Sequence, residues 1–227
     1  MPTFAKANEW TPIGPWEIES NKGGLSVLTV SVVTMDPTTS TTLYVAISDG
    51  PGIASYEDLF KTTDGGRSWQ KLQNPLEHGL AGVGELTSII VDPHNPKILY
   101  INDGNDISKS TDGGRTWTYI GPHFVITPPP RGASFVRLGS LVLVPTAPEI
   151  LYALPDDYGG VYKSTDGGNH WTAINKEFEF SGLFVDPTSS TTVYATYGKR
   201  FFKSTDGGQT WQNRSTVSKG GIQTLAI

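Results

Sequence analysis

The segment FKSTDGGQTW, residues 202–211, decides the fold of this chain because the sequence contains four copies of it. Each copy reads Lys, Ser or Thr, any residue, Asp-Gly-Gly, two further residues and Trp. The Trp residues stand at 69, 117, 171 and 211, so a copy recurs every 40 to 54 residues. This period is typical of the four-stranded blade of a β-propeller. The other three copies are FKTTDGGRSW at 60–69, SKSTDGGRTW at 108–117 and YKSTDGGNHW at 162–171.

The residues around each copy also recur in a fixed order. In the first repeat an apolar segment, 28–35, ends in Asp36-Pro37 and is followed by a Leu-Tyr segment, 43–48. Proline ends a strand because it has no N–H to donate to a neighbouring strand. The Lys-Ser/Thr segment and a short segment that starts at Trp complete four strands. We therefore predict an all-β fold, a β-propeller of four-stranded antiparallel blades with four full blades and a partial fifth.

The Asp-Gly-Gly segment has the chemistry of a tight turn. An Asp carboxylate accepts backbone N–H groups of its own turn, and glycine adopts a positive φ at no steric cost. The Trp ring supplies a large apolar surface to bury between neighbouring repeats. We therefore predict that the Asp and Trp residues of the repeats are structural: Asp64, Trp69, Asp112, Trp117, Asp166, Trp171, Asp206 and Trp211.

This pattern resembles the Asp-box, or BNR, repeat, S/T-x-D-x-G-x-T/S-W. Three copies match it throughout, and the third departs at His170, which is expected to weaken only its own turn. The resemblance is to the superfamily that includes sialidases, sortilin-type receptors, xyloglucanases and photosystem assembly factors. The pattern of the whole repeat is most similar to that of bacterial BNR-like repeat proteins. It implies a propeller fold and an extracellular or periplasmic location, although the sequence shows no signal peptide.

The two ends of the chain read as parts of one further blade. Residues 8–14 resemble the Trp-led last strand of a repeat, and residues 221–227 resemble a first strand. We therefore expect residues 1–227 to form a single Asp-box propeller domain or a fragment of a longer one. An incomplete blade exposes strand edges, which favours self-association at that place.

The composition excludes several classes of function. The formal charge is −5 and there is no basic run, which argues against nucleic acid as a partner. No apolar segment is long enough to cross a membrane. The chain has no Cys, and its four His residues are far apart, so neither a metal site nor a cofactor is expected.

The loops that differ between repeats are the candidate binding surface. In a four-stranded blade the loops between the second and third strands lie on the rim opposite the Asp boxes, and propeller loops commonly carry binding residues. Acidic, amide and aromatic side chains are frequent there, and aromatic rings beside carboxylates suit sugar rings. The candidate ligand-binding residues are Asp49, Tyr56, Asn102, Asp103, Asp106, Asp156, Asp157, Tyr158, Tyr197 and Arg200.

Two functions remain open from the sequence. The first is non-catalytic recognition of a glycan or a protein through this variable rim. The alternative is a glycoside hydrolase resembling the xyloglucanases, because Asp157 begins an Asp-x-Gly-Gly segment; Asp103 and Glu85 are candidates for a second carboxylate. A sialidase is disfavoured, because its site needs three arginines and two of the six in this chain, Arg67 and Arg115, stand in Asp boxes.

Overall fold

The computed structural model describes residues 29–48, 57–73, 86–104, 106–121, 138–155, 160–175 and 180–216. These residues form sixteen β-strands and no helix. The strands make four sheets of four, each joined in simple sequence order by antiparallel pairing. The prediction of four full propeller-type blades is confirmed, whereas the predicted partial fifth blade, 8–14 with 221–227, lies outside the described residues.

Each blade contains one Asp box, between its third and fourth strands. Blade 1 consists of β1 (Thr29–Met35), β2 (Leu43–Ser48), β3 (Glu57–Thr62) and β4 (Gln70–Lys71). Blade 2 consists of β5 (Ser88–Val91), β6 (Leu99–Asn102), β7 (Ile107–Ser110) and β8 (Thr118–Tyr119). Blade 3 consists of β9 (Leu138–Leu143), β10 (Leu151–Pro155), β11 (Val161–Ser164) and β12 (Thr172–Asn175). Blade 4 consists of β13 (Gly182–Val185), β14 (Val193–Tyr197), β15 (Arg200–Ser204) and β16 (Gln212–Thr216).

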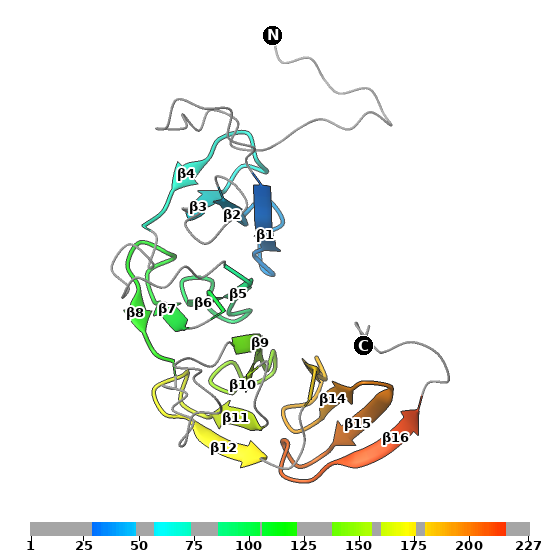
Figure 1. Cartoon of the computed structure of the whole chain (residues 1–227). Helices are drawn as coiled ribbons and strands as arrows, with labels where there is room; N and C mark the ends of the chain where they lie inside the picture. Colours follow the sequence, from blue (N-terminus) through cyan, green and yellow to red (C-terminus); the bar gives the residue numbers. More distant parts are fainter. Residues whose placement is uncertain are drawn as a thin grey trace, which may run out of the picture.

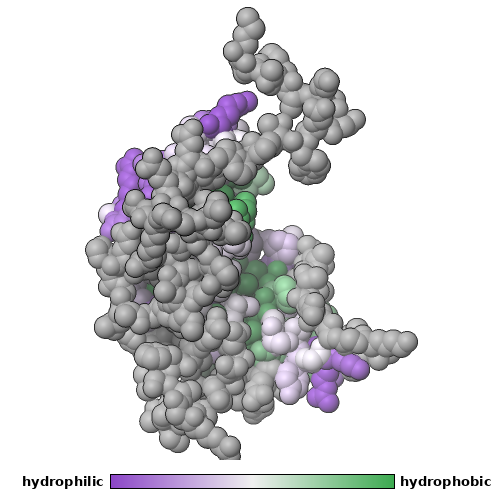
Figure 2. All heavy atoms as spheres, turned by 45° about the horizontal axis from the view of Figure 1, so that its top comes forward, coloured by the Kyte–Doolittle hydropathy of each residue, from purple (hydrophilic) through white to green (hydrophobic). Residues whose placement is uncertain are grey.

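The four blades follow one another around an open arc (Figure 1). The first strands of the blades lie on the inner side of the arc, and β4, β8, β12 and β16 lie on its outer side. Blade 1 and blade 4 form the two ends of the arc, which stand apart (Figure 1). Hydrophobic residues gather along the hollow inner side (Figure 2).

The core lies between successive blades because alternate side chains of a strand point to opposite faces of its sheet. On β10, Leu151 and Ala153 pack against blade 2, whereas Tyr152 and Leu154 pack against blade 4. The junction between blades 1 and 2 is built in the same way around Tyr44 and Leu99. The Trp residues of blades 2, 3 and 4 pack against these three junctions: Trp117, Trp171 and Trp211.

The Asp-Pro segments at the ends of β1, β5 and β13 close the turn to the second strand. The Asp36 carboxylate accepts a 2.8 Å hydrogen bond from the N–H of Thr38, and Asp186 does the same for Thr188 at 2.9 Å. Asp92 accepts one from His94 at 2.7 Å. These aspartates are therefore turn residues as well, a role that follows from the same self-capping chemistry as the Asp box.

Candidate functional site

The Asp box is a closed set of hydrogen bonds within seven residues. In blade 2 the Ser110 hydroxyl donates to Asp112 at 2.8 Å and accepts the N–H of Gly114 at 2.9 Å. The Asp112 carboxylate accepts the backbone N–H of Thr116 at 2.9 Å and its hydroxyl at 2.6 Å. The same contacts recur in the first and fourth boxes, and all of them except the last hydroxyl contact recur in the third.

His170 takes the place of a hydroxyl residue in the third box. Its ring Nδ1 contacts Asp166 Oδ2, and its backbone N–H donates to Asp166 Oδ1 at 2.9 Å. The imidazole therefore makes the contact that Ser68, Thr116 and Thr210 make through their hydroxyls in the other boxes.

These hydrogen bonds stabilise the ionised form of every box carboxylate. Hydrogen bonds from Ser68 hold the pKa of Asp64 well below its usual range, and those from Thr116 do the same for Asp112. His170 lowers the pKa of Asp166 to about 2 through its backbone and ring hydrogen bonds, and Thr210 lowers that of Asp206 to about 2. Because a general acid must be protonated near the working pH, these four carboxylates are unsuited to that role.

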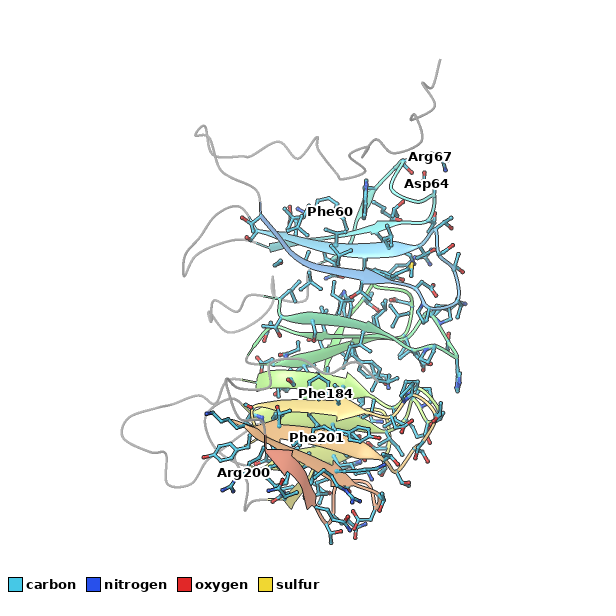
Figure 3. The ribbon with its side chains drawn as sticks, turned by 90° about the vertical axis from the view of Figure 1, so that its right-hand side faces the viewer. Phe60, Asp64, Arg67, Phe184, Arg200 and Phe201 are labelled. Carbon is cyan, nitrogen blue, oxygen red and sulfur yellow. The ribbon has the colours of Figure 1, made fainter. Side chains whose placement is uncertain are left out.

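The Asp boxes and the variable loops lie on opposite rims of the blades. In Figure 3, Asp64 and Arg67 lie on one side of the sheets and Arg200 lies on the other. Within the described residues, the variable rim is seen at two of the loops between second and third strands: residues 102–106, excluding 105, and residues 197–200.

The loop after β6 is held by its own polar side chains. Asn102 is buried; its amide donates to the carbonyl of Leu138 at 3.3 Å and its side-chain oxygen accepts the N–H of Gly104 at 2.8 Å. The Asp103 carboxylate, also buried, accepts the N–H of Asp106 at 2.6 Å. Asn102 and Asp103 thus shape the loop and join it to β9, whereas Asp106 is exposed.

Tyr119 joins this loop from the outer strand β8. Burial and the nearby Asp106 carboxylate, to which it donates a hydrogen bond, raise the pKa of the Tyr119 hydroxyl to about 12. The Tyr119 side chain is nevertheless 40% exposed. Asp106 and Tyr119 together form an exposed carboxylate beside an aromatic ring. Sequence reasoning missed Tyr119, because only the fold brings β8 next to the β6–β7 loop.

Tyr197 and Arg200 face each other across the hairpin between β14 and β15. The turn between them contains Gly198 with φ 56°, a conformation that glycine adopts without strain. Both side chains are exposed. The hairpin therefore presents an aromatic ring and a guanidinium side by side at the variable rim.

The structure does not place the remaining candidates. Asp49, Tyr56, Glu85, Asp156, Asp157 and Tyr158 lie outside the described residues, so their roles as binding or catalytic residues stay predictions. Among the described residues there is no group of three or more metal-binding side chains and no helix that could span a membrane.

These features define an Asp-box repeat protein built from propeller blades. The profile of the BNR/Asp-box repeat matches residues 202–213, which are the fourth box and the start of β16. No curated protein sequence matches the chain. The resemblance to BNR repeat propellers that the four boxes carry is thus confirmed for the repeat and for the fold.

Solved structures with a similar fold include three enzymes of glycoside hydrolase family GH74. One from Niastella koreensis is 24% identical, with a TM-score of 0.59 over 81% of this chain. An ancestral GH74 enzyme is 21% identical, with a TM-score of 0.60 over 92%, and a GH74 xyloglucanase from Xanthomonas campestris is 16% identical, with a TM-score of 0.61 over 85%. This chain spans 30%, 26% and 32% of those chains. At these identities the likeness is one of fold.

Proposed function

We propose that this propeller unit recognises a glycan or a protein through its variable rim, outside the cell or in the periplasm, and does not catalyse a reaction. The observation that carries the proposal is the division of polar groups between the two rims. The box carboxylates are committed to their own turns. The described part of the variable rim instead presents exposed side chains that carry charge or an aromatic ring: Asp106, Tyr119, Tyr197 and Arg200.

These side chains suit a sugar ligand. Aromatic rings stack on the apolar faces of pyranose rings, and carboxylate and guanidinium groups accept from and donate to hydroxyls. Each residue of the two pairs stands on a strand or on a short turn anchored to strands, which reduces the entropy lost when a ligand orders it. The same groups serve recognition of a protein loop, where tyrosine and arginine contribute much of the binding energy.

Binding to a panel of immobilised glycans, followed by calorimetry on any that bind, tests the proposal. We expect Tyr197→Ala and Arg200→Ala to weaken binding about tenfold or more, since truncation of such contacts commonly costs more than about 1 kcal/mol. Arg115→Ala is the matched control, because Arg115 is an exposed arginine on the Asp-box rim. Equal effects of Arg115→Ala and Arg200→Ala would contradict a site on the variable rim.

The alternative is a glycoside hydrolase, either in this chain or in a longer protein that contains it. Support for it comes from the Asp-x-Gly-Gly segment at Asp157 and from the GH74 enzymes that share the fold. The test is release of reducing sugar from xyloglucan by the wild type and by Asp157→Asn. Turnover that is lost in Asp157→Asn would establish the hydrolase and overturn the proposal of recognition alone.

A further inference from the structure

Two of the three junctions between described blades, those of blades 2 and 3 and of blades 3 and 4, share one polar contact. There a Tyr and a Lys of one blade lie against the first glycine of the next Asp box, and at the junction of blades 1 and 2 Lys61 stands at the same place, beside Gly113. Lys109 donates to the carbonyl of Gly167 at 2.9 Å, and Tyr152 and Lys163 lie 3.2 and 3.4 Å from the carbonyl of Gly207. In each blade the Lys ammonium also stands over the Tyr ring, 5.0 to 5.3 Å from its centre.

Blade 4 presents the same pair of residues on the sheet face that points away from blade 3, here called its outer face. Lys203 lies 5.3 Å from the centre of the Tyr194 ring, the arrangement seen in blades 1 to 3. Tyr44, Tyr100 and Tyr152 are fully buried in junctions, whereas Tyr194 is only partly buried. No described blade follows blade 4, so the Tyr194–Lys203 pair meets no Asp box among the described residues.

The apolar part of this face repeats the pattern. Phe201 occupies the position two residues before the blade lysine, where blades 1, 2 and 3 have Leu59, Ile107 and Val161. Those three side chains are fully buried, and Phe201 is only partly buried. Its ring stacks on Tyr194 with 5.6 Å between ring centres. Figure 3 shows Phe184 and Phe201 together in blade 4. The outer face of blade 4 is thus built as the first half of a junction.

Blade 1 presents the second half. Among the described residues, a Cβ placed on Gly65, the first glycine of its box, would meet no atom within 4 Å, whereas one on Gly167 would lie 2.7 Å from Lys109 Nζ. In the later blades the box Trp residues donate to carbonyls of the preceding blade, Trp117 to Gln73 and Trp171 to Ile120.

The first strand of blade 1 shows the same difference. Val33 and Met35 alternate with Val32 and Thr34, which contact blade 2, so they point toward the open end of the arc. Val33 is 62% exposed and Met35 is 53% exposed. The equivalent side chains in the later blades are buried against the preceding blade: Ile89, Val91, Leu141, Leu143 and Leu183.

We propose that two copies of this chain bind each other through the ends of their arcs. The outer face of blade 4 in one copy contacts the Asp box of blade 1, residues 62–69, in the other copy. The charges are complementary, because Lys203 would meet a box that contains the Asp64 carboxylate. The contact joins different surfaces of the two copies, so it is heterologous and must close into a ring or extend into a filament. Two copies that engage both pairs of ends give eight blades, within the usual range for closed propellers.

Two observations indicate that the proposed contact between copies involves the Asp-box turn and the first strand of blade 1. The apolar side chains behind the first box are already buried: Val45, Ile47 and Phe60. Within the described part of the chain, Gly65, Val33 and Met35 meet no neighbour of the kind that the internal blades have.

The mass in solution tests the proposal first. Light scattering after size exclusion should give twice the mass of the chain, and the dimer should dissociate on dilution. Lys203→Glu places a carboxylate opposite Asp64 and should weaken dimerisation about tenfold or more. Lys199→Glu makes the same change of charge at an exposed turn on the other rim and should leave dimerisation unchanged. A folded monomer at all concentrations, or equal effects of the two variants, would overturn the proposal.

Crosslinking tests the direction of the contact and is clean because the chain has no Cys. A Thr63→Cys variant and a Lys203→Cys variant are mixed and treated with a short bismaleimide. The expected product is the mixed dimer, and Thr63→Cys with Lys199→Cys should give none. The double variant Lys163→Cys/Thr205→Cys calibrates the reagent, because these positions span an internal junction within one chain. A product from Lys203→Cys alone, or no mixed dimer where the calibration succeeds, would contradict the head-to-tail contact.

Discussion

The ammonium of Lys109 in blade 2 donates a 2.9 Å hydrogen bond to the carbonyl oxygen of Gly167 in blade 3, 58 residues later. It also lies 5.3 Å from the centre of the Tyr100 ring. One side chain thus links its own sheet to the Asp-box turn of the next blade. The lysine of the repeat is therefore a junction residue, a role that the local pattern around the box does not reveal.

Replacement of Lys109 by Met should weaken the junction between blades 2 and 3. The change keeps most of the apolar stem but removes a hydrogen bond from a charged donor and the contact of the cation with the ring, so we expect a loss of about 1–3 kcal/mol in the free energy of unfolding. Urea denaturation measures it. Lys97→Met, at an exposed turn, is the control; equal losses would mean that the Lys109 contact contributes nothing specific.

The buried hydroxyl of the Asp box should matter more than the exposed one. Ser110 is buried and binds both Asp112 and the N–H of Gly114. Ser110→Ala leaves that buried N–H without a partner and should cost about 1–3 kcal/mol. Thr116→Ala removes an exposed hydroxyl and should cost less than about 1 kcal/mol. Thermal unfolding of the two variants would contradict this account if Thr116→Ala were the less stable.

The second glycine of the box should tolerate no side chain. Gly208 has φ +89°, and a Cβ there would lie 2.6 Å from Cδ1 of Ile174 in the preceding blade. Gly198 also has a positive φ, +56°, but a Cβ there would meet none of the described residues within 4 Å. We expect Gly198→Ala to cost about 1–2 kcal/mol from backbone strain and Gly208→Ala about 1–3 kcal/mol more from overpacking. Similar denaturation midpoints for Gly198→Ala and Gly208→Ala would show that the Ile174 side chain moves to make room for the added methyl group.

Stability should fall in acid because of the box carboxylates. The pKa values of Asp166 and Asp206 are about 2 in the folded chain, against about 3.9 for an unfolded Asp. The folded state therefore binds fewer protons, so this contribution is fully present above about pH 4 and is lost as the pH falls through about 2. The urea midpoint should be level from neutral pH to about 5 and then decline. Asp206→Asn should decline less steeply than the wild type, and a parallel decline would exclude a contribution from Asp206.

His170 should be replaceable by the residue that the other boxes use. Its ring and backbone N–H both contact the Asp166 carboxylate. His170→Thr restores a hydroxyl at this place and should leave the free energy of unfolding within about 0.5 kcal/mol of the wild type, whereas His170→Ala should lose about 1 kcal/mol. Chemical denaturation at neutral pH distinguishes the two. A greater loss in His170→Thr would show that the imidazole makes a contact that the hydroxyl cannot.

The sequence by itself determined the blades and the Asp boxes. In a box such as 62–69 the hydrogen bonds join residues at most four positions apart, so the order of side chains along the chain is sufficient to specify them. The same holds for the strand order, because short turns join consecutive antiparallel strands. The glycines of each box were predictable for the same reason, since a positive φ is a local requirement.

Only the tertiary structure decided which residues of different segments meet. Tyr119 reaches Asp106 from another strand of its blade, and Lys163 contacts Gly207 across a junction. The repetition of Tyr and Lys in every blade was visible in the sequence, but their partner lies 44 to 58 residues away along the chain. The docking of one twisted sheet on the next fixes such contacts, and it also makes the fully buried Tyr152 differ from the partly buried Tyr194.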